Sequence, residues 1–394
     1  MLDRVPPRVA AGQGRVALPP EIAFLIGDVA EDALVAAAAR AGRIGTAAQD
    51  ELVASNAISA KDYARLLARH TGLDAASAVA PWHDNAAACC PRLPIRAGLV
   101  AVRNGNRGVA VAALPQGQMA RRLIEKSAGL SALIPPVVVA PPQTFHDALI
   151  ARHGRDILRA AIEDLENVFP NASARSGSAV WQRSALAALV VGGLAGLVTA
   201  PAVAMLVLLG VVSVFFLGVS ILRLVAVSAA ATQPTRGVDI KLSDADLPVY
   251  TVLVPLYGEA NMVAPLLAAL DRIDYPRAKL DIKLIVEADD VDTQAALRGR
   301  DLRAGYEIVT VPQGQPKTKP RALNFALKLA RGTLVTIFDA EDWPQPSQLR
   351  HAAAVFRDSP PDVACLQARL AWYNWADNWL TRGIMAQTPP DLAV

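Results

Sequence analysis

Short apolar runs alternate with amphipathic segments over the last third of the chain. Runs rich in β-branched residues are typical of buried strands, and the segments between them have the apolar spacing of helices. The predicted strands are Val249–Val254, Ile282–Val286, Tyr306–Val311 and Leu334–Phe338. The predicted helices are Ala260–Leu270, Thr293–Arg303 and Pro320–Ala330. This alternation predicts an α/β fold in which helices cover a parallel sheet.

A long apolar stretch precedes this region. From Ser184 to Leu222 there is no Asp, Glu, Lys, Arg or His, and the stretch is about twice the roughly 20 residues that cross a membrane. We predict two transmembrane helices within residues 181–225, separated at Val198–Pro201. Arg183 and Arg223 at the outer ends place both flanks on the cytoplasmic side, as in a protein of a bacterial inner membrane. The alternative is a helical hairpin buried in a soluble core.

The first part of the chain, residues 20–165, mixes helical and strand patterns, which predicts an α+β domain. Ser59 is a predicted N-cap and Gly72 a predicted helix stop. The predicted helices are Glu31–Ala41, Ala47–Ser55, Lys61–His70, Gln118–Lys126 and Gln143–His153. The predicted strands are Ala97–Val102, Gly108–Ala113 and Val137–Ala140. A separate helix over Asp156–Asn171 is expected to lead into a hinge before the membrane.

Composition narrows the class of protein. The chain has 394 residues, of which 53% are hydrophobic and 19% charged, and its net charge is +3. Abundant apolar residues exclude disorder for most of the chain, and the small charge gives no reason to expect a nucleic-acid partner. The three cysteines, Cys89, Cys90 and Cys365, have neither a disulfide framework nor a metal-ligand spacing. The expected segments are a flexible N-terminus (1–19), the α+β domain (20–165), the spans (181–225), a linker (226–247), the α/β domain (248–382) and an unrelated tail (383–394).

Polar residues follow the predicted strands of the α/β domain. They are grouped as Tyr257–Asn261, Glu287–Asp290, Lys317–Lys319 and Asp339–Asp342. The carboxyl ends of parallel strands form one edge, where ligands of such sheets bind. Carboxylates beside lysines suit a divalent cation together with a diphosphate. Taken singly, Asp289 and Asp290 are also compatible with turns, Lys317 and Lys319 with solvated surface positions, and Asn324 with helix packing.

These groups resemble the motifs of family 2 glycosyltransferases of the GT-A fold, particularly the membrane-bound, cellulose-synthase-like branch. The matching residues are Val254–Glu259, Glu287–Asp290, Lys319–Asn324 and Asp339–Asp342, in the family's order. The resemblance implies a nucleotide-diphospho-sugar donor, expected to be uridine-based. It also implies a polysaccharide or glycan acceptor and inversion at the anomeric carbon. Such a chain would be a hexosyltransferase for polysaccharide synthesis.

The same resemblance assigns roles to single residues. Tyr257, Glu259 and either Glu287 or Asp289 would contact the nucleoside, and Lys319 would lie near the diphosphate. Asp339 and Glu341 stand in place of the family's D-x-D and would bind Mg2+ or Mn2+. Glu at the third position departs from that motif, and Asp342 is the candidate substitute.

Residues 20–165 resemble the amino-terminal module of type II secretion ATPases. The matching stretches are Leu52–Ser59, Leu66–Leu73, Pro91–Leu93 and Val109–Ala112. The resemblance implies a docking surface for a protein partner. Some relatives bind cyclic di-GMP, but only Arg43-Ile44-Gly45 is near their motif. No G-x-x-x-x-G-K-[ST] loop occurs in the chain, so an ATPase is not expected.

The acceptor-side motifs of the family are not found in the sequence. There is no T-E-D for the general base and no Q-x-x-R-W. We therefore expect a domain truncated near Arg382 that holds the donor-binding half and is inactive alone, with no catalytic base assigned. Two alternatives stay open. One is a membrane-tethered protein that binds a nucleotide or docks a partner without catalysis, and the other is a secretion assembly platform.

Overall fold

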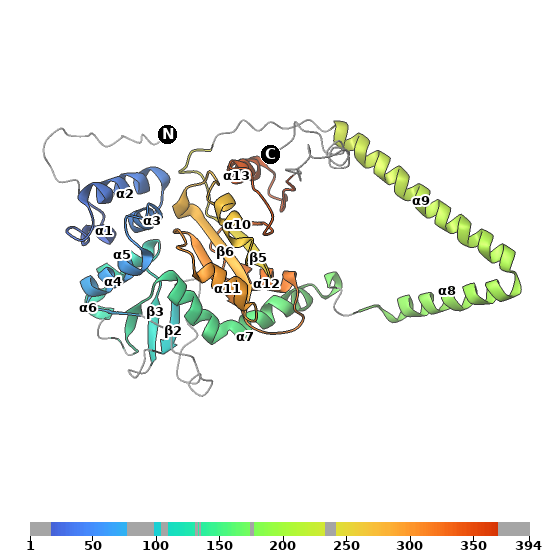
Figure 1. Ribbon diagram of the computed structural model, residues 1–394, viewed down its shortest axis with the longest axis horizontal. Coiled ribbons are helices and arrows are strands. Elements are labelled where there is room, and N and C mark those ends of the chain that lie inside the picture. The colour runs from blue at the N-terminus through green and yellow to red at the C-terminus, as the bar shows by residue number, and fades with distance from the viewer. Residues whose placement is uncertain are drawn as a thin grey trace. The chain divides into compact units, whose positions relative to one another are not determined.

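The computed structural model describes residues 17–76, 98–103, 109–130, 133, 135–173, 177–232 and 242–368. The predicted tail at 383–394, the truncation point near Arg382 and most of the predicted N-terminal segment 1–19 lie outside these ranges. The chain divides into two compact units. The first contains Met1–Ile162 and Ile240–Ala368, and the second contains Glu163–Asp239. The course of the chain is shown in Figure 1.

A four-stranded parallel sheet forms the centre of the first unit's C-terminal part. Its strands are β5 (Tyr250–Leu256), β6 (Leu280–Glu287), β7 (Tyr306–Val311) and β8 (Leu334–Ile337). The order is β7-β6-β5-β8, and every pair is parallel. All eight residues of β6 are buried, as expected of a strand covered on both faces. The four predicted strands and the parallel sheet are confirmed.

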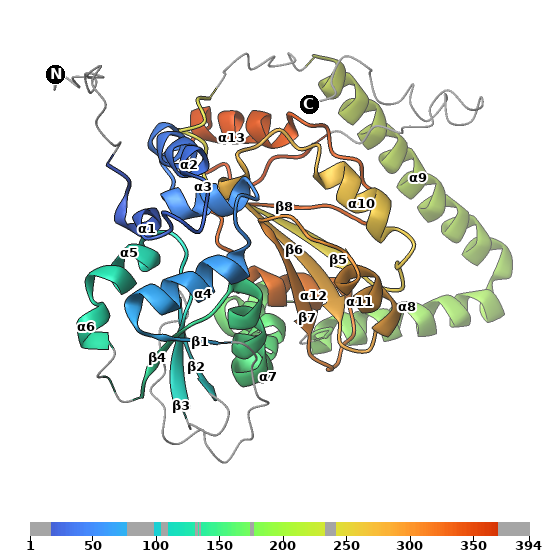
Figure 2. The same cartoon turned by 60° about the vertical axis from the view of Figure 1, so that its left-hand side comes forward.

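Helices follow the strands in the predicted alternation (Figure 2). They are α10 (Val263–Leu270), α11 (Val291–Arg298), α12 (Lys319–Leu327) and α13 (Gln348–Asp358), with the short 3-10 turn η5 at Arg277–Lys279. Pro320 lies in the first turn of α12, where its missing N–H costs no helical hydrogen bond. The helix α10 was predicted with an earlier start, and α11 and α12 were predicted with later starts and later ends than observed. The helix α13 was not predicted.

The N-terminal part contains a second, mixed sheet of order β1-β4-β3-β2. Its strands are β1 (Asp74–Ala75), β2 (Leu99–Arg103), β3 (Val109–Ala113) and β4 (Val137–Val139). The helices are α1 (Pro20–Ala23), α2 (Glu31–Ile44), α3 (Ala48–Ala54), α4 (Ala60–Thr71), α5 (Gln118–Glu125), α6 (Ser127–Leu130) and α7 (Pro142–Val168). The resemblance of this part to secretion ATPases stays a prediction.

Two helix ends behave as their sequences predict. The Ser59 hydroxyl accepts a hydrogen bond from the Asp62 backbone N–H at 3.0 Å, which caps α4. Gly72 ends the same helix with a φ of 69°. Gly45 ends α2 in the same left-handed conformation, with a φ of 77°. Gly45, part of the near-match to a cyclic di-GMP motif, therefore has a structural role as a helix cap.

The helix α7 is continuous, although its sequence predicts two helices with a break near residue 154. The reason is the packing of Gly154 against the end of β7. A Cβ atom at Gly154 would lie 3.0 Å from Cγ of Pro312. Gly154 therefore allows close approach of the helix to the sheet and does not end the helix.

One hydrophobic core contains side chains from both parts of the first unit. Phe145, Leu149 and Leu158 of α7 belong to the same buried cluster as Val309 of β7 and Phe325 of α12.

Polar contacts fix the relative register of these two parts. The Gln143 side chain donates to the Ile308 carbonyl at 3.0 Å and accepts from the Ile308 N–H at 3.1 Å. The Asn324 amide donates to the Ala161 carbonyl at 3.1 Å. Of the two roles considered for Asn324, helix packing is therefore the observed one.

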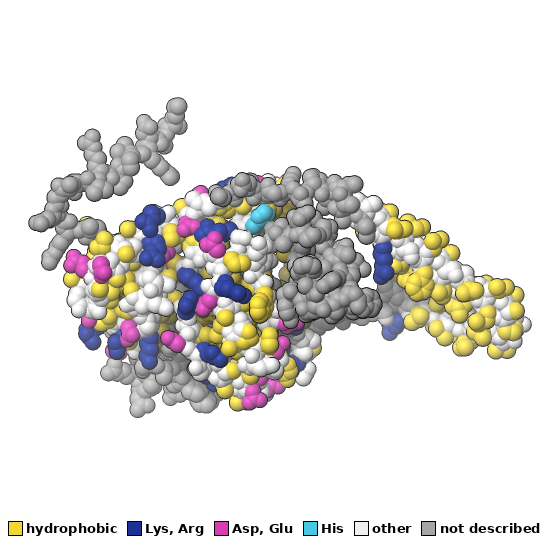
Figure 3. Space-filling view, turned by 45° about the horizontal axis from the view of Figure 1, so that its top comes forward, with side chains coloured by type: hydrophobic (Ala, Val, Ile, Leu, Met, Phe, Trp, Pro, Cys, Tyr) yellow, Lys and Arg dark blue, Asp and Glu magenta, His cyan; other side chains and the backbone are white. Residues whose placement is uncertain are grey.

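The second unit contains the two apolar helices. They are α8 (Val180–Thr199) and α9 (Pro201–Thr232), which are joined at Ala200. The short 3-10 turn η4 (Pro170–Ala172) precedes α8. Both Val180–Thr199 and Pro201–Ala226 are long and apolar enough to cross a membrane, and neither is buried in the protein. Their exposed surfaces are largely hydrophobic (Figure 3). This exposure argues against the alternative of a hairpin buried in a soluble core.

A lysine inside the parallel sheet generates a prediction about folding. The Lys283 side chain is fully buried, lies 3.0 Å from Oδ1 of Asp281 and also donates to Glu307. Replacing Lys283 with Met should lower the free energy of unfolding by about 3–5 kcal/mol, because the buried carboxylates of Asp281 and Glu307 lose the cation that lies between them.

Denaturant unfolding of the full chain in detergent, followed by tryptophan fluorescence, measures this loss. Lys126→Met is the control because that side chain is exposed. An unchanged stability in Lys283→Met would contradict the assignment.

Candidate functional site

The carboxyl ends of the parallel strands bring the predicted polar groups to one edge of the sheet. Tyr257 directly follows β5, Asp289 lies just beyond β6, and Asp339 follows β8. Lys317 and Lys319 come from the segment that enters α12. The parallel register, which runs through Leu256 and Val286, puts these ends side by side.

Asp290 holds the loop after β5 in place. Its Oδ2 accepts the Gly258 N–H at 2.7 Å, and its Oδ1 accepts the Thr293 N–H at 3.1 Å, which caps α11. Burial acts to raise the pKa of Asp290, but the hydrogen bonds from Gly258 and Thr293 lower it below the ordinary value. Gly258 adopts a φ of 69°, a conformation that suits glycine. Asp290 is therefore a turn and capping residue that positions Tyr257 and Glu259.

Lys317 joins the loops after β5 and β6. Its Nζ donates to the Tyr257 hydroxyl at 2.7 Å and to Oδ2 of Asp289 at 2.5 Å. The hydrogen bond from Lys317 lowers the pKa of Asp289, and the same bond raises the pKa of Lys317. Tyr257 is 59% exposed. These three side chains form an open cluster that solvent and a ligand can reach.

A second group of charges lies at the end of β8. Lys319 forms an ion pair with Asp339. Asp342 accepts the Asp339 N–H at 2.7 Å, so its carboxylate closes the turn that carries Asp339 and Glu341. Glu341 is exposed. In this group Asp342 is bonded to the backbone, whereas the carboxylates of Asp339 and Glu341 extend toward solvent.

Glu259 connects the two groups electrostatically. Burial raises its pKa, and repulsion from Glu341 and Asp339 raises it further, against the opposing effects of the Tyr257 backbone and Lys319. Its Oε2 atom is buried, and none of the described residues forms a hydrogen bond with it. A carboxylate oxygen left in this state beside two other carboxylates is suited to accept a cation.

Glu287 differs from the other predicted residues because it is only 7% exposed. Its carboxylate accepts a hydrogen bond from the equally buried Arg321 at 2.5 Å. This pair ties the end of β6 to α12. Of the two carboxylates considered for the nucleoside, Asp289 therefore lies on the open edge and Glu287 lies beneath it. Arg321 was missed by the sequence analysis, although its place directly after Lys319-Pro320 was a signal.

Among the described residues, no three or more His, Cys, Asp or Glu side chains form a preassembled metal cluster. A site with fewer protein ligands still fits magnesium or manganese, which usually binds one or two carboxylates together with substrate phosphates. Asp339 and Glu341 are available for that purpose, and Glu259 lies close enough to affect them.

Comparison with known proteins finds a family to which this region is similar. Residues 248–388 match the family described as "Glycosyltransferase like family 2". The segment is similar to that family over these residues, and the curated relatives described below are named as glycosyltransferases or as a glycolipid synthase.

Three curated relatives match this chain over part of their length. The β-monoglucosyldiacylglycerol synthase of Trichormus variabilis is 26% identical over 184 residues, covering 46% of this chain and 38% of the relative. A probable glucomannan 4-β-mannosyltransferase of Arabidopsis thaliana is 26% identical over 160 residues, or 36% of this chain and 27% of the relative. The poly(ribitol-phosphate) β-N-acetylglucosaminyltransferase TarS of Staphylococcus aureus is 27% identical over 125 residues, or 30% and 21%. The chain thus spans 38% of the length of the first of these relatives.

Solved structures also match over part of the chain. A mannosyltransferase from Pyrobaculum calidifontis, in complex with GDP-Man and Mn2+, is 29% identical with a TM-score of 0.31, covering 39% of this chain and 44% of that one. TarS residues 1–349 of Staphylococcus aureus, in complex with UDP-GlcNAc, are 22% identical with a TM-score of 0.25, covering 28% and 31%. TM-scores this low add nothing to the sequence match.

The raised pKa of Glu259 predicts a pH-dependent stability. The ordinary pKa of 4.5 applies to the unfolded chain, and the folded chain takes up the proton at higher pH. The contribution of Glu259 to stability is therefore full below pH 4.5 and is lost as pH rises through the folded pKa. Glu259→Gln cannot ionise, so its Tm should exceed that of the wild type at pH 7 and equal it below pH 4.5.

Thermal unfolding at a series of pH values measures this difference. Glu125→Gln, an exposed position on α5, serves as the control and should leave Tm unchanged at every pH. A Glu259→Gln variant that is less stable than the wild type at pH 7 would contradict the burial and repulsion assigned to this carboxylate.

Proposed function

We propose that this chain is a membrane-bound glycosyltransferase that binds a nucleotide-diphospho-sugar at the carboxyl edge of its parallel sheet. The observation that carries the proposal is the convergence of Tyr257, Asp289, Lys317, Lys319 and Asp339 at that edge. The family 2 match of residues 248–388 supports it. The acceptor would be a glycan or glycolipid, as the names of the relatives suggest.

The nucleoside would bind at the cluster of Tyr257, Asp289 and Lys317. The Tyr257 ring is exposed and can lie against a base, and the Asp289 carboxylate can accept hydrogen bonds from base or ribose. The Lys317 ammonium group forms a hydrogen bond with that carboxylate. Binding would therefore require Lys317 to release Asp289, and its charge would then be available to a phosphate.

The diphosphate would bind beside Lys319, Asp339 and Glu341. Mg2+ or Mn2+ held by these two carboxylates would stabilise the negative charge that the leaving diphosphate acquires. Lys319 would exchange its bond to Asp339 for a phosphate oxygen. The unpartnered Oε2 of Glu259 supports a cation at this place, whereas Asp342 would keep its role in the turn.

The apolar helices α8 and α9 would anchor this site at a lipid bilayer. Arg183 and Arg223 at their outer ends support a cytoplasmic location for both flanking parts. The inner membrane of a bacterium is the membrane that we propose. Donor binding would then take place on the side where nucleotide sugars are made available by soluble metabolism.

A direct test uses the full chain in lipid nanodiscs with Mn2+ and a panel of UDP-glucose, UDP-N-acetylglucosamine and GDP-mannose. Release of nucleoside diphosphate together with a labelled product on added glycan or glycolipid would support transfer. Binding of a donor without any product would support a donor site in a chain without catalysis, as expected of the donor-binding half alone or of a nucleotide-binding protein. No binding of any donor would overturn both.

The nucleoside site generates a prediction about affinity. Asp289→Asn should weaken UDP binding by about tenfold or more, because the charged acceptor for the base or ribose is lost. Isothermal titration of the full chain with UDP measures the change. Asp292→Asn, an exposed position on the same loop-helix segment, is the matched control and should bind UDP like the wild type.

The metal site generates a prediction about cation dependence. In Asp339→Asn, Mn2+ should no longer strengthen UDP binding, whereas the weaker metal-free binding should persist because the nucleoside contacts remain. Titrations with and without Mn2+ separate the two effects. The control is Asp358→Asn, exposed at the end of α13. Unchanged Mn2+ enhancement in Asp339→Asn would place the cation elsewhere.

A further inference from the structure

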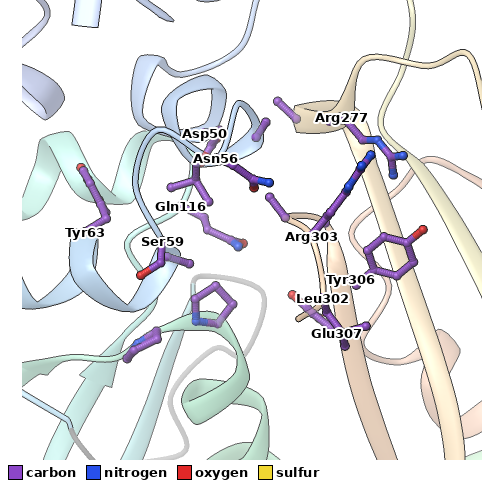
Figure 4. Close-up of a pocket in the computed structure, with 18 of the residues that line it drawn as sticks. Asp50, Asn56, Ser59, Tyr63, Gln116, Arg277, Leu302, Arg303, Tyr306 and Glu307 are labelled. Atoms are coloured by element: carbon purple, nitrogen blue, oxygen red, sulfur yellow. The ribbon is translucent and has the colours of Figure 1, made fainter. Parts of the chain in front are cut away.

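A second cleft lies at the opposite edge of the parallel sheet from the donor site. It has a volume of about 460 Å3 and lies between the N-terminal part and the amino ends of β6 and β7, where Leu280 and Tyr306 line it. Figure 4 shows Asp50, Asn56 and Gln116 on one wall and Arg303 and Tyr306 on the other. The length of β6 separates this cleft from the donor edge by roughly 20–25 Å.

Gln49 and Arg277, which line the cleft, each have one buried polar atom that forms no hydrogen bond with the described residues. Gln49 is 1% exposed, and its Nε2 donates to the Gly117 carbonyl at 2.6 Å, which orients the amide. The other amide atom, Oε1, is buried and unpartnered, so an acceptor is left unused. On the opposite side, Arg277 donates through Nη2 to Asp271 at 2.9 Å, and its guanidinium lies over the Tyr306 ring, 6.0 Å from the centroid. Its Nη1 is buried and has no hydrogen-bond partner within the described part of the chain. Leaving such groups unsatisfied is costly.

The charges of the cleft are unevenly distributed between its walls. Arg277 and Arg303 share the single carboxylate of Asp271, at 2.9 Å and 3.5 Å. The side chain of Arg303 is 59% exposed and can turn toward a ligand. On the other wall, burial raises the pKa of Asp50 to about 6, and its carboxylate accepts the Gly117 N–H at 3.1 Å. Asp301 also lines the wall that carries Arg277 and Arg303, and Lys61 also lines the wall that carries Asp50. Arg277 and Arg303 together can offer donors to an anion, and Gln49 and Asp50 can offer acceptors.

We propose that this cleft binds a small phosphorylated metabolite, with its phosphate on Arg277 and Arg303 and its N–H or O–H donors on Gln49 and Asp50. Guanidinium groups are well matched to phosphate oxygens in geometry and charge. The volume lies within the range of small-molecule sites. A nucleoside monophosphate and a sugar phosphate share this chemistry. The proposal does not rest on the function of the donor site.

A ligand here would act on both parts of the first unit at once. Gln49 and Asp50 belong to α3 of the N-terminal part, whereas Arg277 belongs to η5 directly before β6. Bridging these elements would stabilise their packing against each other. Binding of a metabolite in the cleft would therefore also affect the α/β domain, which carries the donor site.

The test measures binding of UMP, AMP, glucose 1-phosphate and inorganic phosphate to the full chain in nanodiscs by isothermal titration. Saturating UDP is included in a parallel series, so that binding at the donor edge is separated from binding at the cleft. We expect at least one organic phosphate to bind in the presence of UDP. Arg303→Ala, which removes an exposed side chain, should weaken that binding by about tenfold.

Three further variants separate the possible explanations of the result. Arg277→Lys keeps the charge but removes the planar fork, so it should also weaken binding, and Arg159→Ala, exposed on α7, should not. Asp289→Asn should leave binding at the cleft unchanged, even if the donor site fails. The proposal is overturned if no organic phosphate binds, if UDP displaces every one, if inorganic phosphate alone binds as tightly, or if Arg303→Ala binds like the wild type.

Discussion

The parallel pairing of β5 with β6 and β8 is the constraint on which the candidate site depends. Because all the strands run in one direction, every loop that follows a strand opens at the same edge. The side chains of Tyr257, Asp289 and Asp339 are far apart in the sequence and meet only for this reason. Asp290 then fixes the loops against each other through its two backbone hydrogen bonds. An antiparallel partner in the place of β6 would send Asp289 to the opposite edge.

Buried charged side chains stabilise the opposite edge of the same sheet, at the amino ends of β6 and β7. Lys283 lies between Asp281 and Glu307, and Asp281 also accepts from Arg331 at 3.1 Å. Arg331 in turn donates to Gln116 of the N-terminal part at 3.1 Å. These contacts, together with the shared hydrophobic core, join two stretches that the apolar helices α8 and α9 separate in the sequence. The N-terminal part is thus a structural support of the α/β domain, and the cleft with Gln49 and Arg277 forms where the two meet.

The sequence predicted those features that depend on local pattern. The strand β7 was predicted with its observed bounds, because β-branched residues are abundant in the run Tyr306–Val311. The open-edge positions of Asp289 and Asp339 followed from the strand ends. Long-range contacts decided the rest. Nothing local shows that Arg321 reaches Glu287 and covers it, or that Gly154 packs against Pro312 and lets α7 continue. The helix α13 could have been predicted from the helical spacing of its apolar residues Leu349 and Ala353.

The most direct measurement of the central claim is photolabelling of the full chain with 5-azido-UDP-glucose in the presence of Mn2+, followed by peptide mapping. If the carboxyl edge of the sheet binds the nucleoside, the label should lie within residues 255–260 or 287–290, or on Lys317, and excess UDP should prevent it. Labelling confined to the N-terminal part, or labelling that UDP does not reduce, would contradict a donor site at this edge.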